Sequence, residues 1–345
     1  MALANAQAIL PQYGLNAATL DHITLGNINE TYQVQVPTSR YILQRLNPIF
    51  APEVHYDIEA ATRHLQAAGL VTPRLVPTLQ GRLWVETADG EIWRLQTFIP
   101  GQVLSSNRDP ARCQAAGFLL GRFHAALADL PLALQGTRPS IHDTPGHLAG
   151  LSAALDAHRG HVAYDQVAPL AEQILHLAAQ LPTVHGLPAR LVHGDPKLNN
   201  IIFAEDGSAR ALIDLDTLGR MPLVLELGDA WRSWCNPGGE DRSDSGFALE
   251  LFAASLEGYA STARSWLTPA EADSLERAVD TIALELGARF ARDVLEERYF
   301  SWDRVRYQAA WQHNLVRARS QLQVATSYQA QHDEVRSLLA RVLQK

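Results

Sequence analysis

Two short polar segments, each enclosed by apolar residues, constrain this chain more than any other feature. The first reads His193-Gly-Asp-Pro-Lys-Leu-Asn-Asn200 and the second reads Ile213-Asp-Leu-Asp216. Between them, residues 204–208 read Ala-Glu-Asp-Gly-Ser, and a central Asp-Gly is typical of a hairpin turn. The pattern predicts two short buried strands joined by this turn, which brings the polar groups at their ends together.

These polar groups are the ones that phosphoryl transfer from a nucleotide requires. Asp195 is a candidate general base toward an attacking hydroxyl group. Asn200 and Asp214 are candidate ligands for Mg²⁺, which binds few protein oxygens together with phosphates and water. Lys197 is a candidate cation for the phosphoryl group in transfer, and its alternative role is a solvated loop charge. The alternative for the whole feature is a structural hairpin, because Asp, Asn and Gly are common in ordinary turns.

The order His-x-Asp-x-Lys-x-x-Asn, followed by an Asp between apolar residues, resembles the aminoglycoside phosphotransferase/choline kinase superfamily. Within it, the chain is most similar to N-acetylhexosamine 1-kinases and related anomeric sugar kinases. The resemblance implies an α+β fold of the bilobal protein-kinase-like type, with a small antiparallel β-sheet lobe and a large, mainly helical lobe. It is carried by residues 26–32, 41–47, 195–200, 213–217, 228–232, 289–290 and 313–315.

Local patterns along the chain agree with two lobes. Residues 30–36 and 91–98 alternate in polarity, which predicts strands, and Pro52 to Gly69 predicts a helix. After residue 110 most segments outside the hairpin have helical spacing, including residues 269–299 and 302–325. We therefore expect a nucleotide-binding lobe over residues 1–98, a hinge over residues 99–101 and a C-terminal helical lobe with the acceptor site over residues 102–345.

The resemblance implies ATP and Mg²⁺ as cofactors and places adenine against the hinge backbone, near Gln96, Phe98 and Ile99. The alternative for these three residues is a plain strand end. Gly26, Asn29 and Thr31 are expected to contact the nucleotide from the loop and strand before residue 32.

A cation of the small lobe is expected at the nucleotide phosphates. The strand Tyr41–Leu46 offers Gln44 and Arg45, and only one of these neighbours can face the cleft. Its charge favours Arg45, with Glu53 or Glu59 of the following helix as its ion-pair partner. The alternative is that these glutamates are ordinary surface residues of the helix.

Support for the site is expected from three further residues. His193 is predicted to brace the catalytic loop through hydrogen bonds, and Asp229 and Arg232 are predicted to form a buried pair beneath the metal-binding strand. Asp216 is a third candidate metal ligand, with a contact to the sugar or a loop cap as alternatives.

The acceptor is expected to be a sugar, bound by aromatic and hydrogen-bonding side chains. Trp231, Trp234, Tyr299 and Trp311 are candidates to stack on a pyranose ring, and their alternative is an ordinary core position. Hydroxyl or N-acetyl groups are expected to be held by Asn27, Asp195, Arg289 and His313.

Composition excludes several other classes. A formal net charge of −8 argues against a nucleic-acid surface. The 2 cysteines form no disulfide framework and fit a reducing cytoplasm. The N-terminus lacks the basic region of a signal peptide, and no apolar stretch is long enough to span a membrane. We expect a cytoplasmic monomer or homodimer.

The leading hypothesis is an ATP- and Mg²⁺-dependent kinase that phosphorylates a sugar hydroxyl, the anomeric one of an N-acetylhexosamine or a related hexose. The alternative is the same chemistry on an aminoglycoside, choline or another amino alcohol. A catalytically inactive pseudokinase is disfavoured because Asp195, Asn200 and Asp214 are all present. Protein kinase activity is disfavoured because no Ala-Pro-Glu segment follows Asp214.

Overall fold

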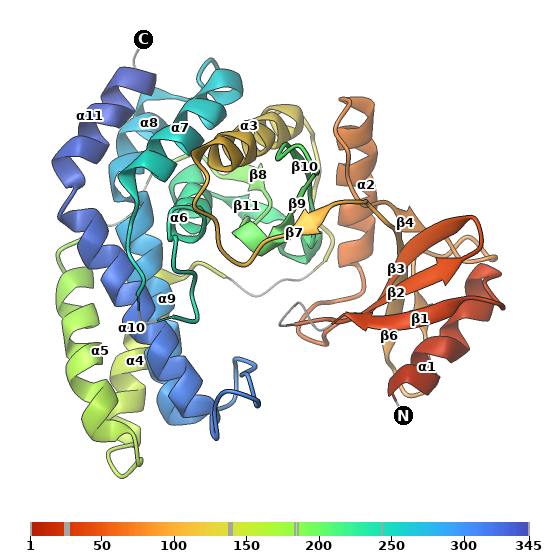
Figure 1. Ribbon diagram of the computed structural model, residues 1–345, viewed down its shortest axis with the longest axis horizontal. Helices are drawn as coiled ribbons and strands as arrows, with labels where there is room; N and C mark the ends of the chain where they lie inside the picture. Colours follow the sequence, from red (N-terminus) through yellow and green to blue (C-terminus); the bar gives the residue numbers. More distant parts are fainter. Residues whose placement is uncertain are drawn as a thin grey trace.

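The computed structural model describes residues 2–23, 28–136, 141–182, 184, 186–242 and 244–343. These residues form one lobe around an antiparallel sheet and a second lobe that is mainly helical (Figure 1). This confirms the predicted α+β, bilobal, protein-kinase-like fold. The lobe boundaries at residues 98–102 stay a prediction.

The sheet of the small lobe has the strand order β1-β2-β3-β6-β4, and β5 also pairs with β6. Every pairing in it is antiparallel. The strands are β1 (Thr19–Ile23), β2 (Glu30–Val36), β3 (Ser39–Arg45), β4 (Leu75–Val76), β5 (Val85–Glu86) and β6 (Ile92–Thr97).

Alternation along these strands separates an apolar face from a polar one. Tyr32, Leu43 and Leu95 are buried on the apolar face, which packs against α1 (Ala2–Ile9) and the 3₁₀ helix η1 (Leu10–Tyr13). The neighbouring residues, Gln44 and Gln96 among them, point to the opposite face and line a cavity. The sheet therefore presents polar groups toward the second lobe.

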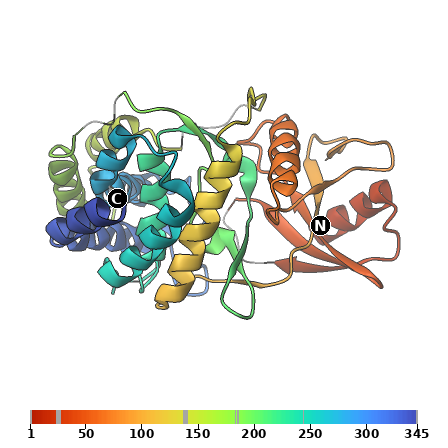
Figure 2. The same ribbon diagram turned by 90° about the horizontal axis from the view of Figure 1, so that it is seen from above.

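Helix α2 (Val54–Ala67) confirms the helix predicted between Pro52 and Gly69, and Gly69 follows its end with φ 76°. Such a left-handed residue after a helix is a common stop signal. Val54, Ile58, Ala61 and Leu65 are buried at helical spacing and belong to the main apolar core. In the view of Figure 2, α2 lies beside α3, which it contacts at the junction of the lobes.

The large lobe consists of helices around a few short strands. Helices α3 and α7 pack closely, because glycines remove side chains from the contact. A Cβ atom on Gly117 would lie 2.0 Å from the Ser255 carbonyl oxygen, and one on Gly258 would lie 2.0 Å from that of Gln114. The helices are α3 (Pro110–Leu127), α4 (Thr144–Ala157), α5 (Tyr164–Ala178), α6 (Leu223–Trp234), α7 (Leu249–Ala263), α8 (Pro269–Ser274), α9 (Ala278–Glu296), α10 (Ala310–Gln329) and α11 (His332–Leu343).

The predicted hairpin is present as β9 (Ile201–Phe203) and β10 (Ala209–Leu212), paired antiparallel. Its turn places Gly207 at φ 85°, as the Asp-Gly pattern predicts. Strand β7 (Gln102–Val103) adds to β9, and β8 (Arg190–Val192) pairs with β11 (Gly219–Met221). The 3₁₀ helices η2 (Leu198–Asn200) and η3 (Leu215–Thr217) follow β8 and β10, and Lys197 and Asp214 directly precede them.

Two helix predictions were too long. The segment 269–299 is divided into α8, the 3₁₀ helix η4 (Leu275–Arg277) and α9, and the segment 302–325 becomes helical only at Ala310. Before α10, the Asp303 carboxylate accepts the backbone N–H groups of Val305 (2.8 Å) and Arg306 (3.1 Å). This local turn competes with the helix that the spacing predicted.

Cys113 and Cys235 are buried free thiols, in agreement with the absence of a disulfide framework. Among the helices of the described residues, none combines the length and the apolar content needed to span a bilayer.

Candidate active site

The loop after β8 is held from below by buried groups. The carboxylate of Glu226 on α6 accepts the backbone N–H groups of His193 (3.0 Å) and Gly194 (2.8 Å). His193 is fully buried, and its Nε2–H donates to the Ile213 carbonyl at 2.8 Å. Its Nδ1 accepts the N–H of Asp195 at 3.3 Å. As predicted, His193 braces the loop, and it ties the loop to the strand that leads to Asp214.

Three of the predicted residues meet on this loop. Lys197 Nζ lies 2.5 Å from Asp195 Oδ2, and Asn200 Nδ2 donates to the same oxygen at 3.1 Å. Both contacts use Oδ2, so Oδ1 has no protein partner within the described part of the chain. Burial alone would raise the pKa of Asp195, but the Lys197 charge lowers it below the usual value. Asp195 is therefore an ionised carboxylate with one uncommitted oxygen.

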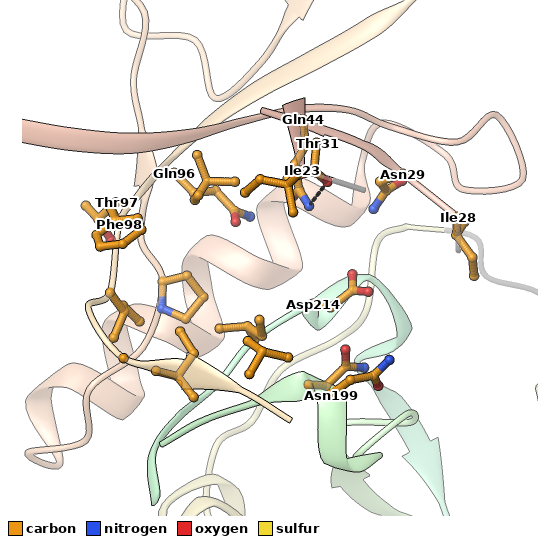
Figure 3. A pocket seen from close by; sticks show the side chains of 18 of the residues that line it. Ile23, Ile28, Asn29, Thr31, Gln44, Gln96, Thr97, Phe98, Asn199 and Asp214 are labelled. Atoms are coloured by element: carbon orange, nitrogen blue, oxygen red, sulfur yellow. Dashed lines mark hydrogen bonds between the residues drawn. The ribbon is translucent and has the colours of Figure 1, made fainter. Parts of the chain in front are cut away.

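Asp214 stands opposite this loop, in a left-handed backbone conformation with φ 65°. Burial, and after it the nearby Asp216 charge, raises the pKa of Asp214 to about 7. Such a buried carboxylate favours a cation as neighbour. Figure 3 shows the Asp214 side chain facing Asn199, whose buried Oδ1 has no hydrogen-bond partner among the residues that the structure describes.

The residues present fit an Mg²⁺ ion. Asp214, Asn200 and Asn199 line the same cavity and are oxygen donors. Within the described ranges, no cluster of three or more His, Cys, Asp or Glu side chains suits a metal ion. An ion here would therefore depend on few protein oxygens and on phosphates, which is the usual arrangement for Mg²⁺. Asn199 was not predicted, although its position next to Asn200 was a signal.

Asp214 and the asparagines form one end of a cavity of about 220 Å³, here called the hinge cavity. Gln96, Phe98 and Ile99, the residues predicted to contact adenine, also line it, and Figure 3 shows Phe98 at the end away from Asp214. Thr31 and Asn29 also lie on its wall, from the small lobe. The predicted residues Gly26 and Asn27 lie outside the described residues.

Arg45 and Glu59 are not at the hinge cavity, contrary to the prediction. Arg45 faces the other side of the sheet, where its guanidinium meets Glu30 at 2.7 Å and Glu91 at 2.8 Å. Glu59 pairs with Arg74 at 2.7 Å instead. Gln44 is the residue that lines the cavity, and it donates to Thr31 Oγ1 at 3.1 Å. Carboxylates on the neighbouring strand and turn explain why the charged residue turns away from the cleft.

Asp216 also differs from its predicted role, because it lines neither cavity described here. The residue as a whole is 1% exposed, its carboxylate receives two hydrogen bonds from Arg94, and Asn29 Nδ2 donates to Oδ2 at 2.6 Å. A carboxylate committed to these donors is not free for a metal ion.

A second cavity of about 320 Å³, here called the helix cavity, begins at Asp195 and Lys197. Lys197 lines both cavities, so they meet at the loop that carries Asp195 and Lys197, here called the catalytic loop for its predicted role. The wall of the helix cavity comes from distant segments, and its charged residues include His142, Asp229, Arg232, Glu240, Glu285, Arg289, Arg298 and Arg317.

Most of these charges are paired within the wall. Arg232 donates to Asp229 Oδ1 at 2.6 Å and also meets Glu240, which confirms the predicted Asp229–Arg232 pair. The pair lines the helix cavity together with Asp195. His142 Nδ1 lies 2.9 Å from Glu285, and this carboxylate raises the pKa of His142 although burial alone would lower it.

Arg289 is the exception. Its guanidinium donates to the Tyr299 hydroxyl at 3.1 Å and stacks on the rings of Tyr299 and Phe300. Within the described residues it has no carboxylate at ion-pair distance, whereas Arg317 pairs with Asp241 and Arg298 with Glu296. Arg289 and Tyr299 thus lie at the cavity as predicted, with one cation left available.

Trp231, Trp311 and His313 are not on the wall of the helix cavity. Trp231 is fully buried with its ring edge against Phe252, Trp311 packs on the main core, and His313 is held between Asp241 and the Asp303 N–H. Trp234 is also buried, and its indole N–H supports the catalytic loop by donating to the Pro196 carbonyl at 2.9 Å.

Several cavity residues were missed. Glu285 lies one helical turn before Arg289, so spacing alone was a usable signal for it. Arg317 lies one helical turn after the predicted residue His313 on α10, so the same signal applied to it. His142 carried no such signal, because only tertiary packing brings its segment to the cavity.

A bilobal fold with a cavity on each side of an Asp-Lys-Asn loop defines the class of kinase-like phosphotransferases. Residues 19–265 match the phosphotransferase enzyme family, which is more than half of the chain, so the chain belongs to this family. It is a small-molecule phosphotransferase that uses a hydroxyl group as acceptor.

Individual relatives are distant. The homoserine kinase of Caulobacter sp. (strain K31) is 26% identical over 281 residues, which cover 78% of this chain and 79% of that protein. An amicoumacin kinase solved with AMP-PNP, Ca²⁺ and amicoumacin aligns with a TM-score of 0.63 at 16% identity, covering 95% of this chain and 96% of the other. A microcompartment-associated aminopropanol kinase aligns with a TM-score of 0.61 at 18% identity, covering 96% and 98%. At these identities the solved structures show the fold alone.

Proposed function

We propose that this protein transfers the γ-phosphoryl group of ATP, with Mg²⁺, to a hydroxyl group of a sugar. The hydroxyl we favour is the anomeric one of an N-acetylhexosamine or a related hexose. The observation that carries the proposal is that Lys197 lines both the hinge cavity and the helix cavity, while Asp195, 2.5 Å from it, lines the helix cavity. A nucleotide in the first cavity and an acceptor in the second would face each other across this pair.

The hinge cavity suits a nucleotide. Phe98 and Ile99 offer apolar surface on its wall, and Thr31, Asn29 and Asp214 offer polar groups on the same wall. Adenine is assigned to the first region and the phosphates to the second. Mg²⁺, held by Asp214 and Asn200 with Asn199 beside them, would offset charge on the phosphates. The amicoumacin kinase, which has the same fold, was solved with an ATP analogue and a divalent cation.

Asp195 is assigned as the general base. Its oxygen Oδ1 accepts the proton of the acceptor hydroxyl, whose oxygen forms a bond to the γ-phosphorus while the bond from phosphorus to the bridging oxygen of ADP breaks. Lys197 holds Oδ2 at 2.5 Å, which orients the carboxylate and places a positive charge near the group in transfer. On the cavity wall, Lys197 compensates the charge of Asp195, and Arg232 compensates the charge of Asp229.

The charge of the helix cavity supports a neutral acceptor over a cationic one. Asp195 meets the cation Lys197, Asp229 meets the cation Arg232, and Glu285 meets the imidazole of His142. Arg289 remains without a carboxylate, so a choline or aminoglycoside cation would meet positive charge. The hydroxyl and carbonyl oxygens of an N-acetylhexosamine can accept from Arg289, and its ring can pack on Tyr299 or Phe300.

A hydroxy amino acid is the second candidate acceptor. One relative of this chain is a homoserine kinase, and the available guanidinium of Arg289 suits a carboxylate. The two candidates differ in the charge that Arg289 would meet.

The test is ATP consumption with Mg²⁺ across N-acetylhexosamines, free hexoses, homoserine, choline and kanamycin, with phosphorus NMR on each product. A sugar 1-phosphate signal would support the leading proposal, and turnover of homoserine alone would replace it with the second. Turnover of cationic acceptors alone would overturn the charge argument. Arg289→Gln should raise the KM of the true acceptor about 10- to 100-fold. The matched control is Arg292→Gln, one turn further along α9, where the guanidinium pairs with Glu296 at 3.0 Å away from the cavity.

A further inference from the structure

A buried ion pair joins the two lobes behind the hinge cavity. Arg94 on β6 belongs to the small lobe, and Asp216 on η3 belongs to the large lobe. The Arg94 side chain is 0% exposed and the Asp216 side chain 2%. Two guanidinium nitrogens of Arg94 meet the two carboxylate oxygens of Asp216, with Nη2 3.0 Å from Oδ2. This fork-to-fork contact defines the relative position of β6 and η3 more narrowly than a single contact would.

The ion pair is connected to the hinge cavity on the small-lobe side. Gln44 Oε1 accepts from Arg94 Nε at 3.0 Å and from Nη2 at 2.8 Å. The amide of Gln44 then donates to Thr31 Oγ1 at 3.1 Å, a contact visible in Figure 3. Both Gln44 and Thr31 line the cavity. Arg94 therefore orients two small-lobe side chains that face the cavity, although it does not line the cavity itself.

The ion pair is also connected to the candidate metal ligand. Asp216 lies two residues after Asp214, whose left-handed backbone at φ 65° turns its side chain into the cavity. Asn29 bridges the same carboxylate to the small lobe, since it donates to Asp216 Oδ2 at 2.6 Å and accepts the N–H of Asn47 at 2.9 Å. A shift of Asp216 would be passed to Asp214 through this short, strained segment.

A contribution to the stability of the fold does not by itself explain why the chain has a buried Arg94–Asp216 ion pair. Removing two charges from water costs about as much as their attraction returns, and apolar residues of similar volume often replace buried ion pairs without loss. What apolar residues cannot reproduce is the direction of five guanidinium donors.

We propose that Arg94 is a positioning residue for phosphoryl transfer: through Asp216 and Gln44 it aligns Asp214 on the large lobe with the phosphate-facing wall of the small lobe. The proposal rests on the proposed nucleotide site in the hinge cavity. On strand β3, Gln44 carries no charge and Arg45 faces away from the cavity. The proposal therefore assigns the alignment of the two lobes to Arg94 on β6.

The test compares a balanced replacement of the pair with a control. The double variant Arg94→Met with Asp216→Leu removes both charges together, whereas Arg94→Met alone takes the arginine away from the buried Asp216 carboxylate and serves as the destabilised reference. Arg94→Lys keeps the positive charge but cannot form the two parallel hydrogen bonds that the guanidinium makes with Asp216. Arg45→Met is the matched control, an arginine of the neighbouring strand that pairs away from both cavities.

For each variant the readouts are Tm, amide hydrogen exchange of residues 213–217 without nucleotide, MgATP affinity by calorimetry, and kcat and KM. The double variant should keep its Tm within a few degrees, lose exchange protection at residues 213–217, and show a MgATP KM about 10-fold higher with kcat about 10- to 100-fold lower. Arg94→Lys should recover part of the kcat, and Arg45→Met should behave as the wild type.

A double variant with wild-type exchange protection, kcat and KM would overturn the proposal and leave the pair a structural contact. Failure of the proposed function is distinguishable, because wild-type protein that binds no MgATP would reject the nucleotide site. In that case, a loss of hydrogen-exchange protection at residues 213–217 in the double variant, with protection kept in the wild type, would still support the role of the pair in aligning the two lobes.

Discussion

Glu226 offers the sharpest test of how the catalytic loop is held. Its fully buried carboxylate accepts three hydrogen bonds, from the N–H groups of His193 (3.0 Å) and Gly194 (2.8 Å) and from His124 Nε2 (3.2 Å). Glu226→Gln preserves the shape, but an amide has one oxygen where the carboxylate has two. At least one buried donor then faces an NH₂ group instead of an acceptor.

The expected loss follows from these contacts. A buried unsatisfied donor costs about 1–3 kcal/mol, and hydrogen bonds to a charged acceptor are stronger than neutral ones. We expect Glu226→Gln to lower the free energy of unfolding at pH 7 by about 2–4 kcal/mol. The loop carries Asp195 one residue after Gly194, and a displacement of about 1 Å at a reacting group can cost about 100-fold in rate. We expect kcat to fall at least about 10-fold.

The effect on stability should also depend on pH. Burial alone would raise the pKa of Glu226, but the His124 hydrogen bond and charge lower it below its usual value. A carboxylate with a depressed pKa in the folded state stabilises the fold above its unfolded pKa, and the contribution is lost as pH falls through the folded pKa. The difference between wild type and Glu226→Gln should therefore shrink in acid.

The assay pairs urea unfolding, followed by tryptophan fluorescence, with steady-state kinetics. Glu271→Gln is the control, since that carboxylate is also fully buried and holds Arg190 at 2.8 and 2.9 Å but lines neither cavity. It should lose comparable stability and keep kcat within about two-fold. An unchanged urea midpoint in Glu226→Gln, or equal loss of kcat in both variants, would refute the reasoning.

Three further predictions concern single carboxylates. Asp195→Asn should lower kcat at least about 1,000-fold and leave MgATP affinity within a few-fold, because the base acts mainly in the transition state; substantial residual kcat, measured by phosphate transfer, would contradict the assignment. Asp214→Ala should weaken Mg²⁺-dependent nucleotide binding in calorimetry, and equal affinity with and without Mg²⁺ in both proteins would count against a metal role. Asp280→Asn should stabilise the fold at pH 7 to 8 by up to about 3 kcal/mol, because burial raises the pKa of Asp280 from 3.8 to about 6 and the folded state then disfavours the charged form above that pH. The gain should disappear near pH 4 in urea titrations, and a gain that is independent of pH would reject this origin.

Much of the catalytic loop was predictable because its contacts are local. The hairpin, its Asp-Gly turn and the meeting of Asp195, Lys197 and Asn200 depend on residues that are close in sequence. The Asp229–Arg232 pair spans three residues of one helix, which is the spacing at which helical neighbours meet.

The choice between Gln44 and Arg45 was not predictable in this way. Strand alternation shows that one of them faces the cleft, but the partners of Arg45 decide which. Glu30 stands opposite Arg45 on β2, and Glu91 lies 46 residues away in sequence. The charge predicted to face the cleft, that of Arg45, is therefore compensated on the other face of the sheet. At the cleft, Gln44 accepts a hydrogen bond from Arg94 instead.

By itself the sequence indicated the family, the two-lobed architecture and the candidate catalytic residues, because these depend on local pattern and on motifs in order along the chain. Tertiary structure alone decided which aromatic residues are core, as for Trp231, and which charged residues meet at the helix cavity. Arg94 and Asp216 are 122 residues apart, and Glu285 meets His142 across 143. No local periodicity encodes such pairs, since their geometry arises only when the apolar faces of the helices and the sheet have packed together.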